Sequence, residues 1–222
     1  MTDHLSYHTR FSPAEFDAEY NLRAGRPDYE VTVIPGWSRD SEKAREKLEC
    51  SVDMRYGEGE KQKLDVFRCN DTTVPTLVYF HGGYWQRGNK SIYSFLAKPY
   101  TLTGVNVVIV GYDLCPRVSI TRISEEAREA ILFLWKKGEE FRLNPHHMVV
   151  MGHSAGGHIT QMMMGTKWSN FDRTVPNDLI KAGIPISPLS YLEPVRLTDA
   201  LNAGIQMDEV EAESQSPMTK HP

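Results

Sequence analysis

One serine set between glycines is the residue best placed to do chemistry in this sequence. Residues 152–156 read Gly-His-Ser-Ala-Gly and follow directly on the apolar run MVVM at 148–151. A serine flanked in this way occupies a sharp turn between a strand and a helix, where larger neighbours would collide with the strand and cover the hydroxyl. The pattern predicts that Ser154 is the nucleophile of an acyl-transfer reaction.

A second motif could stabilise the charge that such a reaction develops. Residues 81–85 read His-Gly-Gly-Tyr-Trp and follow the apolar run PTLVYF at 75–80. An isolated His-Gly-Gly is more typical of a tight turn, but the later serine motif favours an oxyanion hole, in which backbone amides face the developing oxyanion. The amide after the nucleophile is the usual second donor. We therefore predict an oxyanion hole formed by the backbone of Gly82, Gly83, Tyr84 and Ala155.

The elements that must position these motifs follow from the hydrophobic pattern. Unbroken apolar runs at 75–80, 105–112, 147–152 and 180–186 predict buried parallel strands. Two alternating runs at 51–56 and 63–69 predict an antiparallel hairpin before them. The resulting α/β fold is a mostly parallel sheet with helices on both faces, and both His81 and Ser154 lie at the carboxyl ends of strands, where such folds bind ligands.

A crossover helix is predicted between the second and third of these apolar strands. Its apolar stripe consists of Ile123, Ala127, Ala130, Ile131 and Leu134, and the residues placed outside the stripe are Glu125, Glu126, Arg128 and Glu129. Residues 1–50 are polar with scattered aromatics, and short helices with serine caps are predicted at 13–16 and 38–48. We expect one domain over 1–222, with 1–50 as an arm on a core at 51–222.

Composition narrows the class of protein. The chain has 222 residues, a net charge of -4 and scattered Lys and Arg, which argue against nucleic acid and anionic membranes as partners. Cys50, Cys69 and Cys115 are isolated, which is typical of a reducing compartment. No signal peptide or long apolar run is present, so we predict a cytoplasmic protein. His146 and His147 lack a third ligand at useful spacing, so no metal and no cofactor is predicted.

Several segments between about 56 and 217 resemble the arylformamidase (kynurenine formamidase) branch of the α/β-hydrolases, near the hormone-sensitive-lipase-like esterases. They are YGEGEKQKLDVF at 56–67, HGGYWQRGNK at 81–90, VNVVIVGYDLCP at 105–116, GHSAGGHIT at 152–160 and the weak QSP at 215–217. The segment HGGYWQ is the specific one, because the related esterases usually carry HGGG. The pattern of Tyr112, Leu114 and Pro116 supports the superfamily without choosing a branch.

The resemblance implies an activity and site residues. The activity is hydrolysis of N-formyl-L-kynurenine, a step of tryptophan catabolism, or of a similar aryl formamide or small ester. The resemblance also implies that Ser154 is the nucleophile and that the backbone around Gly83, Tyr84 and Ala155 forms the oxyanion hole. The partner is then a small acyl substrate. Tyr84 and Trp85 could line an aromatic pocket, although packing in the core is an equal alternative.

The acid and base of a catalytic triad are not found in this chain. In α/β-hydrolases they follow the serine, on loops after later strands. After the strand at 180–186 no apolar strand follows, so we expect the last strands, the acid and the histidine to lie beyond Pro222. His158 is one helical turn past Ser154 and should point along the helix flank. The remaining candidates are a penultimate tail histidine, His221, and three carboxylates expected on the solvated surface, Asp178, Glu193 and Asp199.

Two other histidines near the motifs are given structural roles. His153 is expected to pack, and His81 to brace the oxyanion loop through side-chain hydrogen bonds. Three functions remain open: a formamidase acting through an acyl-enzyme on Ser154, a general carboxylesterase, or a truncated, non-catalytic homologue that binds a ligand or a partner. An unpaired sheet edge would favour a homo-oligomer in the last case.

Overall fold

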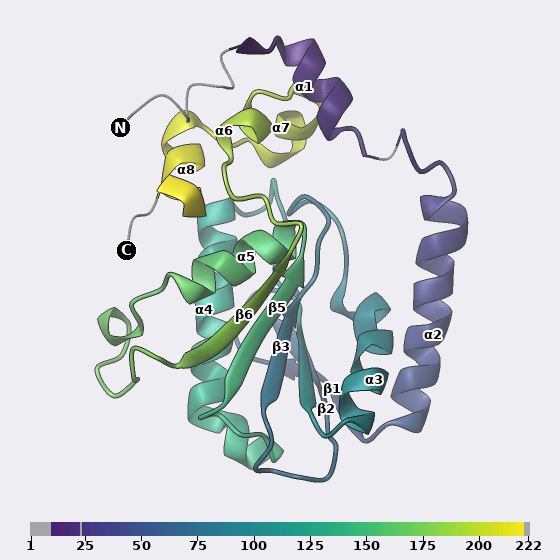
Figure 1. Ribbon diagram of the computed structural model, residues 1–222, viewed down its shortest axis with the longest axis vertical. Coiled ribbons are helices and arrows are strands. Elements are labelled where there is room, and N and C mark those ends of the chain that lie inside the picture. The colour runs from purple at the N-terminus through teal and green to yellow at the C-terminus, as the bar shows by residue number, and fades with distance from the viewer. Residues whose placement is uncertain (1–9, 23, 220–222) are drawn as a thin grey trace.

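A mixed β-sheet forms the centre of the molecule (Figure 1). The computed structural model describes residues 10–22 and 24–219. Within them the strands are β1 (Cys50–Arg55), β2 (Lys63–Phe67), β3 (Thr76–Phe80), β4 (Asn106–Val110), β5 (Met148–His153) and β6 (Ile180–Ile186). Their order is β1-β2-β4-β3-β5-β6. The pairs β1–β2 and β2–β4 are antiparallel and the others parallel, which confirms the predicted hairpin and the parallel strands. The predicted burial of the strand at 180–186 is wrong, because β6 lies at the edge of the described sheet and none of its residues is buried.

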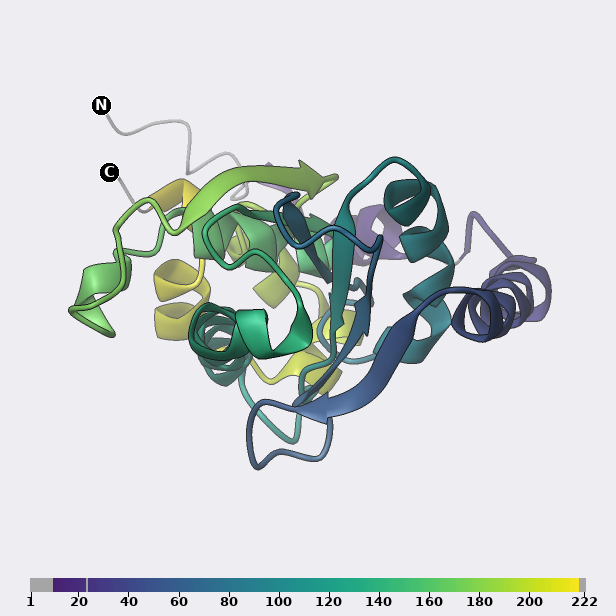
Figure 2. The same cartoon turned by 90° about the horizontal axis from the view of Figure 1, so that it is seen from below.

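Helices cover both faces of this sheet, as predicted (Figure 2). On one face lie α4 (Ile120–Lys137) and α5 (Ala155–Met164), which share a buried core with β3, β4 and β5. On the other face lie the 3-10 segment η3 (Lys90–Leu96) and α3 (Ala97–Leu102), covered in turn by α2 (Ile34–Lys47). Every residue of β3 and β4 is buried, because helices cover these central strands on both sides.

The N-terminal helices differ in part from their predicted bounds. Helix α1 (Pro13–Tyr20) begins at its predicted serine cap, where the Ser12 hydroxyl accepts from the Glu15 amide and Glu15 reaches back to Ser12. Helix α2 begins at Ile34 and not at Ser38. A π-helical turn, η2 (Tyr29–Val33), runs directly into it, and Pro35 suits the first turn of a helix because its missing N–H has no partner there.

The C-terminal residues form short helices that lie with α1 beyond the carboxyl ends of the strands (Figure 1). These helices are α6 (Glu193–Arg196), α7 (Asp199–Ile205), α8 (Glu209–Ser214) and the 3-10 segment η6 (Pro217–Thr219). Two other 3-10 segments, η4 (Gly138–Phe141) and η5 (Trp168–Asn170), lie earlier in the chain. Helices α7 and α8 are separate, because Gln206 takes a left-handed φ of 61° that ends α7. The amide of Ala200 donates to Asp17, which ties α7 to α1. None of the described helices combines the length and apolar composition needed to cross a bilayer.

The crossover helix α4 is present, but one residue predicted outside its apolar stripe is buried. Glu126 is 1% exposed, and its carboxylate accepts from the backbone amide of Asp113 at 2.8 Å, while Arg122 Nε lies 3.5 Å away. Burial is the largest cause of a Glu126 pKa raised to about 7, and Arg122 only partly offsets it. The helix therefore carries a buried acid that anchors the loop after β4.

Glu126 should make the folded state less stable as the pH rises. Its carboxyl group has a folded-state pKa above the unfolded value, so the stability it contributes is full below pH 4.5 and is lost as the pH passes about 7. We expect wild type to lose as much as about 3 kcal/mol between pH 4.5 and 8 relative to Glu126→Gln. Urea denaturation across this range measures the difference. Glu125→Gln, at a half-exposed neighbour on the same helix, is the control and should run parallel to wild type.

Candidate active site

Ser154 stands at a strained turn between β5 and α5. Its backbone has φ 58° and ψ -119°, a conformation that costs a non-glycine residue free energy and persists only where its surroundings enforce it. Two backbone hydrogen bonds do so: the Ser154 amide donates to the Ile186 carbonyl at 2.9 Å, and the Ser154 carbonyl accepts from the His158 amide at 3.0 Å. The first fixes the turn to β6, and the second begins α5.

The glycines of the serine motif are required by close backbone contacts. A Cβ atom on Gly152 would lie 2.2 Å from the Gly156 carbonyl oxygen, and one on Gly156 would lie 2.0 Å from the Phe80 carbonyl oxygen. No side chain fits at such distances, because the contacted atoms belong to the backbone. The start of α5 therefore packs directly on the end of β3, which confirms the steric interpretation of the motif.

The same packing brings the His-Gly-Gly loop against Ser154. A Cβ atom on Gly82 would lie 3.3 Å from the Ser154 Cβ and 2.7 Å from the His153 carbonyl oxygen. Gly83 has φ 128°, in the region that favours glycine, and its Cβ would clash with the Arg87 carbonyl. Ala155 is fully buried as the first residue of α5. The structure thus places Gly82 against Ser154, and the catalytic roles of Gly82, Gly83, Tyr84 and Ala155 remain predictions.

His81 braces this loop, as predicted. The ring is 1% exposed, its Nδ1 lies 2.9 Å from the Gly82 carbonyl oxygen, and it stacks on Tyr112 with ring centroids 4.3 Å apart. The Tyr112 hydroxyl donates to the His81 carbonyl at 2.6 Å. Burial is the main cause of a His81 pKa lowered to about 4, so the ring is neutral at pH 7. Tyr112, given no catalytic role by the sequence, is therefore a support of the loop.

The two aromatic residues after the glycines have different surroundings. Tyr84 is half-buried, and its hydroxyl donates to the Tyr20 carbonyl at 3.1 Å, so the α1 segment covers it; burial raises the pKa of Tyr84 to about 12. Trp85 is 0% exposed and meets the His158 ring edge-on at 5.0 Å. Of the two alternatives given for Trp85, the structure shows packing in the core, because α5 and the residues packed on it enclose the indole.

None of the predicted base candidates contacts the Ser154 hydroxyl. Within the described part of the chain that hydroxyl makes no hydrogen bond. The His158 ring is buried and its Nε2 lies 2.7 Å from the Gln215 carbonyl oxygen, which directs it toward the C-terminal helices. His221 lies outside the described residues. The carboxylates are engaged elsewhere or exposed: Asp178 pairs with Lys181 and Asp199 is exposed.

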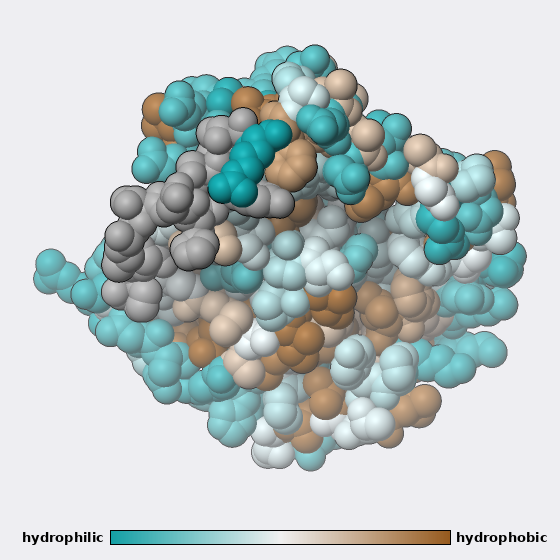
Figure 3. Space-filling view, turned by 45° about the horizontal axis from the view of Figure 1, so that its top comes forward, coloured by the Kyte–Doolittle hydropathy of each residue, from teal (hydrophilic) through white to brown (hydrophobic). Residues whose placement is uncertain are grey.

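Two expectations about polar residues near the site are wrong. Glu193 was expected in solvent, but its side chain is only 15% exposed, because it forms a bidentate pair with Arg196. His153 was expected to pack, but it is exposed. His153 is the last residue of β5 and pairs with Ile186 of β6. Its side chain lies on the face of the sheet that η3 and α3 cover, and this cover extends only as far as β5. On that face Ile184 and Ile186 are 45% and 43% exposed, and Figure 3 shows apolar side chains near the middle of this side of the molecule.

A mixed sheet with this strand order, a strained serine elbow and a glycine loop beside it define an α/β-hydrolase. Esterases of known structure share the fold: an esterase of Pyrobaculum calidifontis superposes with a TM-score of 0.62 at 19% identity. The chain belongs to the BD-FAE family, whose model matches residues 64–183, more than half of its length.

Individual relatives narrow this assignment. A kynurenine formamidase of Salmo salar is 30% identical over 210 residues, which cover 94% of this chain and 67% of that protein. One of Danio rerio is 32% identical over 80% of this chain and 58% of that protein. A provisionally named thioesterase from Silicibacter sp. tm1040 superposes with a TM-score of 0.77 at 31% identity and covers 93% of this chain and 76% of that one. The chain is an arylformamidase-like α/β-hydrolase that spans about three fifths to two thirds of these formamidases.

Proposed function

We propose that this chain carries the nucleophile and oxyanion hole of a hydrolase that cleaves an aryl formamide such as N-formyl-L-kynurenine. In the proposed reaction the Ser154 oxygen attacks the formyl carbon, the aryl amine leaves, and water releases formate from the formyl-enzyme. The observation that carries the proposal is the contact of the Gly82 backbone with Ser154 at a strained elbow. The names of the formamidase relatives supply the substrate class.

The proton transfers of this reaction need a base that the described residues do not offer. His158 is directed toward Gln215, and His81 is enclosed between aromatic rings on the far side of Gly82. Ser154 itself is partly exposed, so a small base in solution can reach it. Imidazole added to the buffer can therefore act as the general base for Ser154.

The substrate is tested by comparing an amide with an ester under these conditions. In buffer with imidazole, the chain is given N-formyl-L-kynurenine, a non-aromatic formamide or p-nitrophenyl acetate at matched concentrations, and the release of kynurenine, formate and p-nitrophenol is measured. We expect release of kynurenine and formate in equal amounts, with kcat/KM for the formamide at least about tenfold above that of a non-aromatic formamide. Kynurenine release that Ser154→Ala leaves unchanged would contradict the proposal.

A carboxylesterase is the second candidate, and the exposed apolar residues beside the elbow favour it. The Ile186 carbonyl accepts from the Ser154 amide, and Ile184 lies two residues earlier on β6. Both isoleucines are exposed and offer a surface for an acyl chain. An esterase of Gibberella moniliformis is 28% identical over 51% of this chain. Turnover of short acyl esters without turnover of the formamide would favour this alternative. The free thiols of Cys50, Cys69 and Cys115 support the proposed cytoplasmic location.

A further inference from the structure

The His-Gly-Gly loop contains a turn of left-handed backbone at residues 83–87. Tyr84 and Trp85 both have a positive φ, 51° and 57°, a conformation that costs a non-glycine residue free energy. The Gly83 carbonyl closes the turn, because it accepts from the amides of the third and fourth residues after it, at 3.1 and 3.0 Å. Two successive strained residues persist only where their surroundings hold them. The contacts of this turn therefore decide whether the proposed oxyanion hole is formed.

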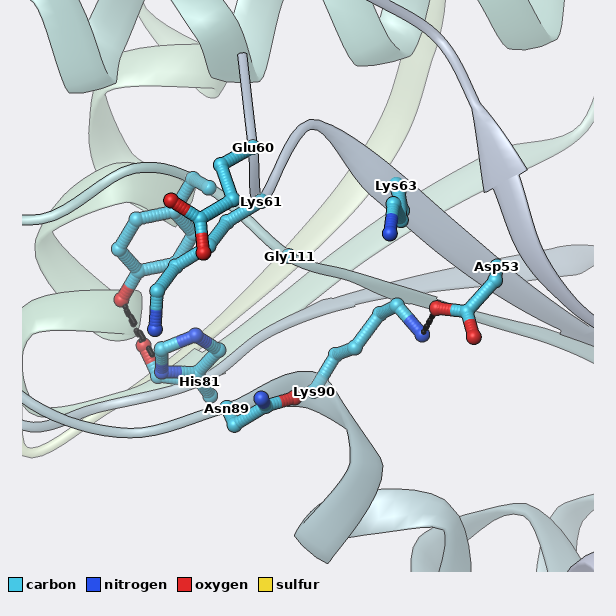
Figure 4. Close-up of a pocket in the computed structure, with 9 residues that line it drawn as sticks. Asp53, Glu60, Lys61, Lys63, His81, Asn89, Lys90 and Gly111 are labelled. Carbon is cyan, nitrogen blue, oxygen red and sulfur yellow. Dashed lines mark hydrogen bonds and ion pairs between the residues drawn. The ribbon is translucent and has the colours of Figure 1, made fainter.

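The sheet holds the two ends of the loop, at His81 and Lys90 (Figure 4). At the start, the Tyr112 hydroxyl donates to the His81 carbonyl at 2.6 Å. At the end, the Lys90 ammonium lies 2.9 Å from the Asp53 carboxylate. Trp85, between these ends, is fully buried in the core. The core therefore fixes both ends of the loop and one strained residue, but the strained residue before it is only half-buried.

Two helices that are distant in the sequence hold the middle of the loop. The Tyr84 hydroxyl donates to the carbonyl of Tyr20, the last residue of α1, at 3.1 Å. The side-chain amide of Gln86 donates to the Leu201 carbonyl of α7 at 2.9 Å. Gly204 of α7 lies against the same side chain, since a Cβ there would approach Gln86 Oε1 to 2.3 Å. We call α1 and α7 the cover helices, and Figure 1 shows both beyond the carboxyl ends of the strands.

The cover helices are also tied to each other. The Asp17 carboxylate of α1 accepts from the Ala200 amide of α7 at 3.1 Å. Amides in the first turn of a helix have no partner inside that helix, and Thr198, which precedes α7, gives no side-chain cap. The Asp17 contact thus replaces the missing cap. A shift of either cover helix moves the other one, and with it both contacts to the loop.

We propose that the cover helices position the oxyanion hole: joined through Asp17, they hold the left-handed turn in place through Tyr84 and Gln86. These two are positioning residues, because they act through the backbone of the loop. The Gly83 and Tyr84 amides donate to no backbone acceptor within the described part of the chain, so they are available to an oxyanion. The catalytic consequence rests on the proposed hydrolysis, whereas the coupling between helices and loop does not.

Amide hydrogen exchange measures the coupling directly. The Gln86 and Arg87 amides close the turn, so their protection reports how often it is formed. We expect Asp17→Ala, at a residue outside the loop, to lower the protection of both amides about fivefold or more. Asp17→Asn keeps an acceptor oxygen and should retain wild-type protection. Glu19→Ala, at an exposed residue of the same helix, is the matched control and should exchange as wild type. Unchanged protection in Asp17→Ala overturns the proposal.

A second variant disturbs the α7 contact without weakening the helix. Alanine favours a helix more than glycine does, but the Cβ added by Gly204→Ala would displace the Gln86 side chain from α7. We expect the turn amides to lose protection as in Asp17→Ala, while the midpoint of urea denaturation does not fall. Wild-type protection of the turn in Gly204→Ala would contradict the proposed role of Gln86.

The catalytic consequence is measured with p-nitrophenyl acetate in buffer with imidazole. We expect Tyr84→Phe and Asp17→Ala each to lower kcat about fivefold or more and to leave KM within about twofold of wild type, because a displaced oxyanion hole affects the transition state more than the bound ester. Asp17→Asn and Glu19→Ala should keep the wild-type kcat. Wild-type kcat in Tyr84→Phe and Asp17→Ala, despite faster exchange, overturns the positioning role. A wild-type chain without turnover counts against the proposed hydrolysis instead, and the exchange measurement still decides the coupling.

Discussion

Replacing Ser154 by alanine is expected to remove the imidazole-dependent turnover of this chain and to change its turnover in plain buffer little. Groups of a catalytic triad act as a unit, so removing the serine costs little when no base is positioned beside it, and none of the described residues is so positioned. Added imidazole supplies a base, and we expect it to raise wild-type turnover by about 10- to 100-fold, up to the low end of the usual contribution of a positioned general base, because free imidazole is not held in place. Ser154→Ala should not respond, because it has no hydroxyl to deprotonate. The rate of p-nitrophenol release against imidazole concentration measures both responses.

Two further measurements make this result specific to Ser154. Imidazole cleaves activated esters by itself, so the rate with Ser154→Ala is the baseline to subtract. A fluorophosphonate probe should label Ser154 slowly without imidazole and faster with it. Rapid stoichiometric labelling in plain buffer would show that a base is already present, and an equal imidazole response in the alanine variant would exclude Ser154 as the nucleophile.

Gly156→Ala is expected to cost more than about 4 kcal/mol of folding free energy, enough to unfold many domains. The added Cβ would lie 2.0 Å from the Phe80 carbonyl oxygen and 2.6 Å from that of His81. Neither carbonyl can move without displacing β3 or the loop after it, so α5 would have to lift away from the sheet. Urea denaturation followed by tryptophan fluorescence measures the loss, since Trp85 and Trp168 are buried in the same core.

Gly165→Ala is the matched control for this prediction. Gly165 ends the same helix, has φ -82°, and a Cβ there would approach nothing closer than 3.5 Å. We expect a change within about 0.5 kcal/mol of wild type. If the two variants have equal stability, the contact between α5 and β3 is looser than the structure describes, and the steric interpretation of the serine motif is wrong.

The features that the sequence predicted well depend on local patterns. The parallel strands are continuous apolar runs, and the elbow follows from glycines at fixed distances from Ser154. The parallel strands and the serine elbow can both be predicted without tertiary information, because the hydrophobic period and the turn chemistry involve only a few neighbouring residues.

The features that were missed depend on contacts between distant segments. Glu126 is buried because a backbone amide in the loop after β4 donates to it, and no periodicity reports that partner. Trp85 is in the core because α5 and its neighbours surround it. Such groupings need the fold before they can be seen.

The hydrogen bond from the Ser154 amide to the Ile186 carbonyl makes the backbone conformation of the reactive serine depend on β6, a strand at the edge of the described sheet. Among the described strands β6 has one neighbour only, so its end can fray at lower cost than the centre of the sheet. Each such opening would release Ser154 from its strained backbone conformation. The exchange rate of the Ser154 amide with solvent deuterium therefore reports how often the elbow is assembled, and that fraction sets an upper limit on the reactivity of the serine.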